Sequence, residues 1–250
     1  MTSANPYEPP QIPEDEPSPA RVTSNENEYE PIPFRSPRWV GNITILLFGL
    51  FVLLTAFAGY AQVRMYLLDN ESTPEEEVDA LAISELRYWM GILAVACLPL
   101  VLTANAWLIA FLFRCHRNLE SLGHRKLDSK HVWVIICWFV PVLNLFCPFQ
   151  VTREIWWRSQ SEAGTSPESI SSHVVFWWWV TKLMAIVLAN LAQFFSEYTT
   201  WPQYHTFLRT ILLACGFDVA TSLLGIFIIY RISHGQIDRY RRVQESTAVT

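Results

Sequence analysis

Long apolar runs alternate with polar stretches along the chain after residue 38. The four longest runs lie at 39–62, 88–113, 174–196 and 207–230. A helix needs about 20 apolar residues to cross the hydrocarbon core of a bilayer, and each run exceeds that length. The pattern therefore predicts an all-α membrane protein built on a bundle of four transmembrane helices.

A fifth hydrophobic segment, residues 131–149, is just long enough to cross but contains Pro141, Asn144 and Pro148. Proline removes a backbone donor and breaks helices, so two interpretations stay open. The segment is either a fifth span or re-entrant. In the re-entrant form, residues 132–140 descend about 13 Å as a helix, and the chain then turns near 141–144 and returns to the same side.

The basic residues near the ends of the spans favour the re-entrant form. If 131–149 turns back, the flanking Lys and Arg residues gather on one side, with Arg64, Arg87 and Arg209 opposite. If it crosses, they divide almost evenly between the two sides. Basic residues accumulate in cytoplasmic loops. We therefore expect cytoplasmic N- and C-termini in a cell inner (cytoplasmic) membrane, with the crossing helix as the open alternative.

Composition divides the chain into a polar beginning and an apolar remainder. Overall, 51% of residues are hydrophobic and 16% are charged, against roughly 25% charged in soluble domains. Residues 1–38 are acidic and proline-rich, which predicts a disordered cytoplasmic tail. Residues 39–242 form the predicted membrane domain, and 243–250 a short tail. The polar stretch 64–87 is expected to be a loop, with a short surface helix after Pro74 as an option.

Polar side chains inside the apolar segments are the first candidates for a functional site, because charge at membrane depth is costly. Lys182 and Asp218 lie on consecutive spans. They can form a structural pair, or Lys182 can reach the lipid headgroups while amides join the helices. The other interpretation is a proton or ion relay, or a small polar pocket. The candidate polar seam consists of Asn105, Asn144, Lys182, Asn190, Gln193 and Asp218.

Four stretches carry a resemblance to a known family: FLFRCHRNLESLG, WFVPVLNLFCPFQVTREIWWRSQ, FWWWVTKL and FDVATSLLGIFIIYRISHGQ. Together they resemble the bacterial domain-of-unknown-function 4328 family over roughly residues 40–240, with the acidic tail and the stretch 64–87 outside the shared domain. The resemblance implies a multi-pass membrane protein of unknown activity. The family pattern falls on Asn118, Trp138, Pro141, Asn144, Pro148, Glu154, Trp156, Trp177, Asp218, Arg231 and Gln236.

Known catalytic and metal-binding motifs are missing from the sequence. It contains no nucleophile elbow, HExxH motif or glycine-rich phosphate loop. Cys115 and His116 beside His124 come nearest to a metal cluster, but their spacing matches no common zinc pattern. We therefore expect no enzyme activity, no cofactor and no metal. No basic surface for nucleic acid is evident.

The expected function is sensing, scaffolding or assembly in the membrane. The expected partners are the lipid bilayer and other membrane proteins or copies of the same chain. The alternative is a small transporter or channel-like protein that uses the polar seam between the last two spans.

Overall fold

The computed structural model describes residues 33–71, 77–124, 127–161, 170–195 and 201–248. These residues are helical or irregular, and none of them forms a strand. Four helices in this part of the chain are long and apolar enough to cross a membrane, which confirms the predicted fold class. They are α1 (Arg38–Glu71), α2 (Glu77–Ser121), α5 (His173–Phe194) and α6 (Trp201–Ala248).

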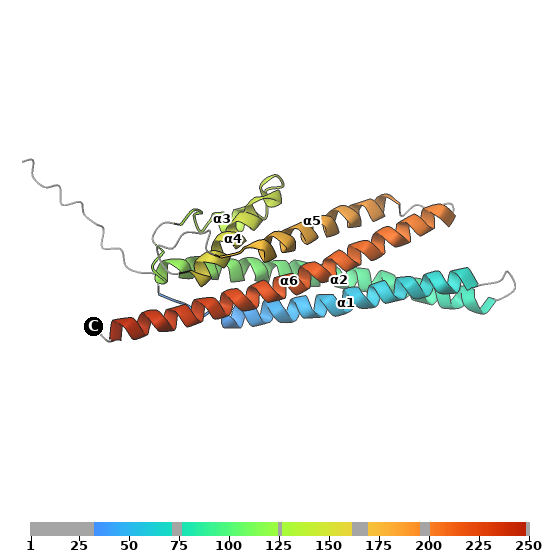
Figure 1. Cartoon of the computed structure of the whole chain (residues 1–250). Helices are drawn as coiled ribbons and strands as arrows, with labels where there is room; N and C mark the ends of the chain where they lie inside the picture. The colour runs from blue at the N-terminus through green and yellow to red at the C-terminus, as the bar shows by residue number, and fades with distance from the viewer. Residues whose placement is uncertain (1–32, 72–76, 125–126, 162–169, 196–200, 249–250) are drawn as a thin grey trace, which may run out of the picture. The chain divides into compact units, whose positions relative to one another are not determined.

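The last helix, α6, is the element around which the others pack. It contacts α1 and α5 along much of their lengths, and it also reaches α2 and α4 (Cys147–Gln160) (Figure 1). At Gly225 the backbone of α6 approaches two aromatic rings, those of Phe48 on α1 and Trp178 on α5. A glycine here lets three helices meet closely, as small residues do in membrane bundles.

Gly225→Ala should destabilise this helix junction. A Cβ atom at this position would lie 2.6 Å from Cε2 of Phe48 and 3.3 Å from Nε1 of Trp178, so the Phe48 ring must shift or the helices must separate. Overpacking of this kind costs about 1–3 kcal/mol. Gly216→Ala is the matched control on α6, because nothing lies within 4 Å of its added Cβ. Thermal unfolding in detergent should show a lower Tm for the Gly225 variant alone; equal Tm values would contradict the close packing.

Large apolar side chains remain exposed along all four long helices. Examples are Leu46 and Leu53 on α1, Val95 on α2, Val187 on α5 and Phe227 on α6. Soluble proteins rarely leave contiguous apolar surface of this kind in water. A lipid environment covers such side chains, so the exposed surface and the helix lengths together indicate a membrane protein.

The helices extend beyond the predicted spans, which corrects two predictions. Stretch 64–87 is not mainly a loop, because α1 runs to Glu71 and α2 begins at Glu77. Residues 243–248 likewise continue α6 instead of forming a separate tail. Adding a residue to an existing helix costs far less than starting a new one, so a span can continue into water through polar residues.

The end of the predicted disordered tail is also more ordered than expected. Residues 1–32 lie outside the described residues, but 33–37 are in place before α1. The ring of Phe34 stacks on that of Tyr240, with centroids 4.1 Å apart. Both backbone polar groups of Arg35 bond to Asn118. The chain is therefore held against α2 and α6 before it enters α1.

Residues 131–149 do not form a single helix. They contain the short α3 (Trp133–Ile136), turns, a 3₁₀ turn at Leu143–Leu145 and the start of α4. Pro148 falls at the start of α4, where its missing N–H is tolerated. The backbone N–H of Asp128 donates to Oε1 of Glu154 at 2.8 Å, so the residues that flank the segment on its two sides meet. Residues 128–154, called the hairpin below, fold back on themselves.

Candidate functional site

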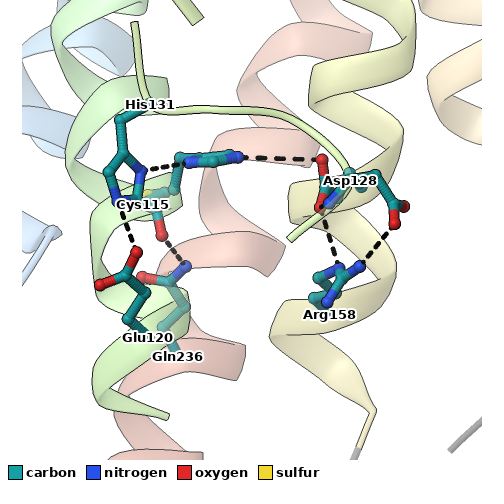
Figure 2. Close-up of polar contacts among 8 residues, drawn as sticks. Cys115, Glu120, Asp128, His131, Arg158 and Gln236 are labelled. Atoms are coloured by element: carbon teal, nitrogen blue, oxygen red, sulfur yellow. Dashed lines mark hydrogen bonds and ion pairs between the residues drawn. The ribbon is translucent and has the colours of Figure 1, made fainter. Parts of the chain in front are cut away.

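A buried polar cluster joins the ends of α2, α4 and α6, and Gln236 lies at its centre. The Gln236 side chain is fully buried. Its Nε2 donates to the carbonyl of Cys115 at 2.9 Å and to Oγ of Ser159 at 3.1 Å. Its Oε1 accepts from Nδ2 of Asn118 at 3.1 Å. Figure 2 shows Gln236 of α6 directed at Cys115 on α2. One amide therefore connects three helices.

Asn118 extends this connection to the beginning of α1. Its Nδ2 also donates to the carbonyl oxygen of Arg35 at 2.8 Å, and its Oδ1 accepts from the Arg35 backbone N–H at 3.1 Å. The residue is 2% exposed. An amide that pairs with both backbone groups of one residue fixes the path of the chain at that point.

Glu154 and Arg158 form a buried ion pair one turn apart on α4. Nε of Arg158 lies 3.1 Å from Oε1 of Glu154, and its Nη2 lies 3.1 Å from Oδ1 of Asp128 (Figure 2). Burial alone would raise the pKa of Glu154. The pKa is lowered instead, because the effect of burial is smaller than the combined effect of the contact with His116, the Asp128 N–H and the charge of Arg158. Glu154 is therefore an ionised carboxylate that ties α4 to the start of the hairpin.

Arg239 of α6 holds the C-terminal ends of α2 and α4. Its Nη1 lies 3.0 Å from the carbonyl oxygen of Arg158, and its Nη2 lies 3.3 Å from that of Leu122. Nη1 also lies 3.0 Å from Nε2 of His124. Burial and the adjacent Arg239 charge lower the pKa of His124 to about 4, so this ring is neutral at neutral pH.

Two further histidines and two glutamates form a row of contacts at the edge of the cluster. Nε2 of His131 lies 2.7 Å from Oε1 of Glu120. Nδ1 of His131 lies 2.7 Å from Nδ1 of His116. Nε2 of His116 lies 3.8 Å from Oε2 of Glu154. The row runs from Glu120 on α2 to His131 in the hairpin (Figure 2), back to His116 on α2 and on to Glu154 on α4.

A second polar site lies within the apolar part of the bundle, around Lys182 of α5. Its Nζ lies 3.2 Å from Oδ1 of Asn105 on α2. It also lies 4.8 Å from the ring centroid of Trp138 and 6.0 Å from those of Trp178 and Trp179. Aromatic faces attract a cation at such distances. These three rings form a tryptophan cage around the ammonium group.

The structure brings together only part of the predicted polar seam. Lys182 contacts Asn105, and it lies near enough to Asp218 for their charges to attract. No ion pair within 4.0 Å links Lys182 to Asp218 in the part of the chain that is described. Asn190 is exposed and donates to the carbonyl of Ile186 on its own helix. Gln193 is also exposed.

The tip of the hairpin is held by Trp179 and not by Asn144. Nε1 of Trp179 donates to the carbonyl oxygen of Leu145 at 2.9 Å. Asn144 bonds through its backbone N–H to the carbonyl of Val140, and no side-chain hydrogen bond of Asn144 is found among the described residues. An indole on α5 thus supplies the donor that holds the tip.

Trp179→Phe should loosen the hairpin tip. The substitution keeps a ring in the cage but removes the part-buried hydrogen bond from the indole to the Leu145 carbonyl, which contributes about 0.5–1.5 kcal/mol. Trp177→Phe is the matched control, because Trp177 is 57% exposed. Limited proteolysis and thermal unfolding in detergent should show weaker protection for the Trp179 variant. Equal behaviour of the two variants would contradict this role of Trp179.

Some residues of the family pattern fall into these two sites. Asn118, Glu154 and Gln236 belong to the polar cluster, whereas Trp138 faces Lys182. Other pattern residues lie in the surrounding elements. Pro148 and Trp156 are buried, and Nε1 of Trp156 donates to the Ser171 carbonyl. Nη2 of Arg231 lies 3.4 Å from Oε1 of Gln160, whereas Pro141 and Trp177 are exposed.

Sequence reasoning did not find four members of the cluster: His116 and His131 as a pair, Arg158 and Arg239. The spacing of Glu154 and Arg158, four residues apart on a helix, is a signal that could have identified their ion pair. The histidine pair has no such signal, because a loop brings His131 back to α2.

The fold and its two polar sites define a helical membrane protein. The family described as "Domain of unknown function (DUF4328)" matches residues 72–234, and the chain belongs to this family. The match begins within stretch 64–87, so part of that stretch lies in the shared domain, whereas 40–71 lies before the match. No curated protein and no solved structure matches the chain.

Proposed function

We propose that the protein is a non-enzymatic scaffold of the bacterial inner membrane, in which the polar cluster fixes the hairpin and the helix ends at the cytoplasmic face. The single observation behind this proposal is the set of groups that the cluster binds. Gln236, Asn118 and Arg239 bond to the backbone of Cys115, Arg35, Leu122 and Arg158. Side chains engaged with backbone in this way serve architecture, because they are not free to meet a substrate.

The distribution of basic residues supports the orientation. Many of them surround the end of the bundle at which the cluster lies, including Arg114 and Arg117 on α2, Arg153 on α4, and Arg231 and Arg241 on α6. The positive-inside rule assigns such an end to the cytoplasm. In this arrangement the four long helices cross the bilayer, both termini are cytoplasmic, and the hairpin enters from the cytoplasmic side.

A scaffold of this kind needs a partner surface, and the end of α6 offers one. Residues 241–246 are helical and exposed. We expect a photo-crosslinker placed there in intact cells to yield discrete adducts with another membrane protein or with a second copy of the chain. Recovery of uncrosslinked protein alone would contradict the assembly role.

The alternative function is a small transporter or channel, favoured by a lysine within a candidate span beside Asn105 and near Asp218. Solute and proton flux in proteoliposomes separates the two proposals. A scaffold should show only background flux. Gradient-driven uptake that is abolished by Asp218→Asn, but kept by Asp238→Asn on the same helix, would overturn the scaffold in favour of the transporter.

A further inference from the structure

The row Glu120–His131–His116–Glu154 connects a partly exposed end to a buried one. The side chains of His131 and Glu120 are 25% and 16% exposed, whereas those of His116 and Glu154 are 0% and 4% exposed. Two of its three contacts are at hydrogen-bond distance, and the third, between His116 and Glu154, is 3.8 Å long. The row therefore lacks one hydrogen bond, the one between His116 and Glu154 at its buried end.

Counting protons explains why that hydrogen bond is missing. Each contact of 2.7 Å needs one shared proton, and an ionised carboxylate can only accept. The contact with Glu120 therefore places a proton on Nε2 of His131, and the contact between the two rings then takes the proton on Nδ1 of His116. Two neutral imidazoles have no further proton to offer. Nε2 of His116 consequently faces Oε2 of Glu154 as a second acceptor.

Both of these facing atoms are buried and lack a hydrogen-bond partner among the described residues. Such unpaired acceptors are costly inside a protein, because each has lost its hydration. One added proton would pair both at once. A charge-assisted N–H···O bond of this kind is typically about 2.7–2.9 Å long, so the gap would also contract.

We propose that the space between Nε2 of His116 and Oε2 of Glu154 is a binding site for a single proton. Uptake converts His116 to an imidazolium that donates to Glu154 on one side and to His131 on the other. The central proton can then move to Nδ1 of His131, and each ring still directs an Nε2–H at a carboxylate. The charge is shared by the histidine pair, which then links α2, the hairpin and α4 through an unbroken row of hydrogen bonds.

The surrounding charges favour a cation here. Glu120 faces the pair from α2, Glu154 and Arg158 lie on α4, and Asp128 lies at the start of the hairpin. Three carboxylates thus oppose two guanidiniums, those of Arg158 and Arg239. On the α6 side the nearest groups are Arg239 and His124, which contact each other and the Arg158 carbonyl.

His124 and Glu154 do not compete with the histidine pair for this proton. The pKa of His124 is about 4, because of burial and then Arg239, so this ring stays neutral until strongly acidic pH. The Asp128 N–H and the Arg158 guanidinium, both at hydrogen-bond distance from Oε1 of Glu154, keep this carboxylate in the accepting form, although burial opposes this.

The site makes the connection between α2 and α4 dependent on pH. Proton uptake is a stabilising interaction gained in the folded state as pH falls. The hydrogen bond between His116 and Glu154 should therefore form in acid and be absent in base. Histidine pairs are suited to this, since their charge changes near physiological pH. This inference concerns the cluster itself and holds for either proposed function.

The test is a titration of full-length protein, labelled with ¹⁵N-histidine, in detergent micelles between about pH 8 and about pH 5. At high pH His116 should give the signals of a neutral ring protonated on Nδ1. At low pH it should give those of an imidazolium, with one proton taken up by the His116–His131 pair. A His116 ring protonated only on Nε2 at high pH, or one that takes up no proton over this range, would overturn the proposal.

Variants identify the ring responsible. His116→Gln should abolish the uptake of that proton, whereas His173→Gln, at an exposed position at the start of α5, should leave it unchanged. If His116→Gln does not fold, His131→Phe, which places no acceptor at this position, provides the second measurement. It removes the Nδ1 acceptor, so His116 should lose its fixed Nδ1–H tautomer. An unchanged His116 tautomer in that variant would also overturn the proposal.

Discussion

Arg158→Met is expected to destabilise the folded protein by about 3–5 kcal/mol, because breaking a buried ion pair leaves an uncompensated charge. The carboxylate left behind, Glu154, is 4% exposed, and the guanidinium that is removed is 8% exposed. Asp128, the other carboxylate at Arg158, is 73% exposed and can return to water. The expected loss therefore comes mainly from Glu154. Thermal or denaturant unfolding in detergent measures it.

Arg153→Met is the matched control on the same helix. Arg153 is exposed, and its guanidinium lies over the ring of Phe149 at 5.5 Å. Its replacement should cost no more than about 1 kcal/mol, the value of an exposed cation–π contact. The double variant Arg158→Met with Glu154→Gln should recover part of the loss, since no buried charge is left without a partner. Equal losses for Arg158→Met and Arg153→Met would contradict the buried pair.

The second large effect is expected at Lys182, where Lys182→Met should cost about 1–3 kcal/mol, because it leaves Oδ1 of Asn105 without its donor and removes the charge that attracts Asp218. Asp218→Asn should also destabilise, because it removes the charge that attracts Lys182. We expect the two losses to be less than additive. Once one charge has been removed, the other is isolated within the bundle, and its removal then costs less stability. A double-mutant cycle of unfolding free energies measures this coupling.

The size of the coupling distinguishes the contacts of Lys182. Hydrogen bonds within membrane bundles contribute about 0.6 kcal/mol on average, so a value of that order between Lys182 and Asn105 would indicate simple helix packing. A larger value between Lys182 and Asp218 would show that their charges interact directly. Strict additivity would contradict the predicted pair, and Asn105 with the tryptophan cage would then account for the lysine.

Local composition was sufficient to predict the spans but not the polar contacts. The runs around Leu50, Leu102 and Ile228 are apolar enough to identify membrane helices on their own. Helix ends were harder, because polar residues such as Glu71 and Glu245 do not stop a helix that has already formed. The hairpin was indicated by Pro141 and Pro148, but the contact between Asp128 and Glu154 that closes it cannot be seen in the sequence.

The polar cluster depends on contacts that no local pattern contains. Gln236 bonds to a carbonyl 121 positions earlier, and Asn118 to a backbone 83 positions earlier. The resemblance named both residues without indicating their partners. At membrane depth, reasoning from charge assigned Lys182 to Asp218, whereas its nearest polar contact is Asn105. An amide and three indoles were not obvious surroundings for an ammonium group.

The most direct test of the account is topology mapping with reporters fused at Ser161 and after Tyr240. The hairpin begins and ends at the polar cluster, and α6 returns to that cluster at Gln236 and Arg239. Both reporters are therefore expected on the same side, in the cytoplasm. A reporter at Ser161 found outside, with the C-terminal one inside, would mean that residues 131–149 cross the bilayer, and would contradict the hairpin on which this account rests.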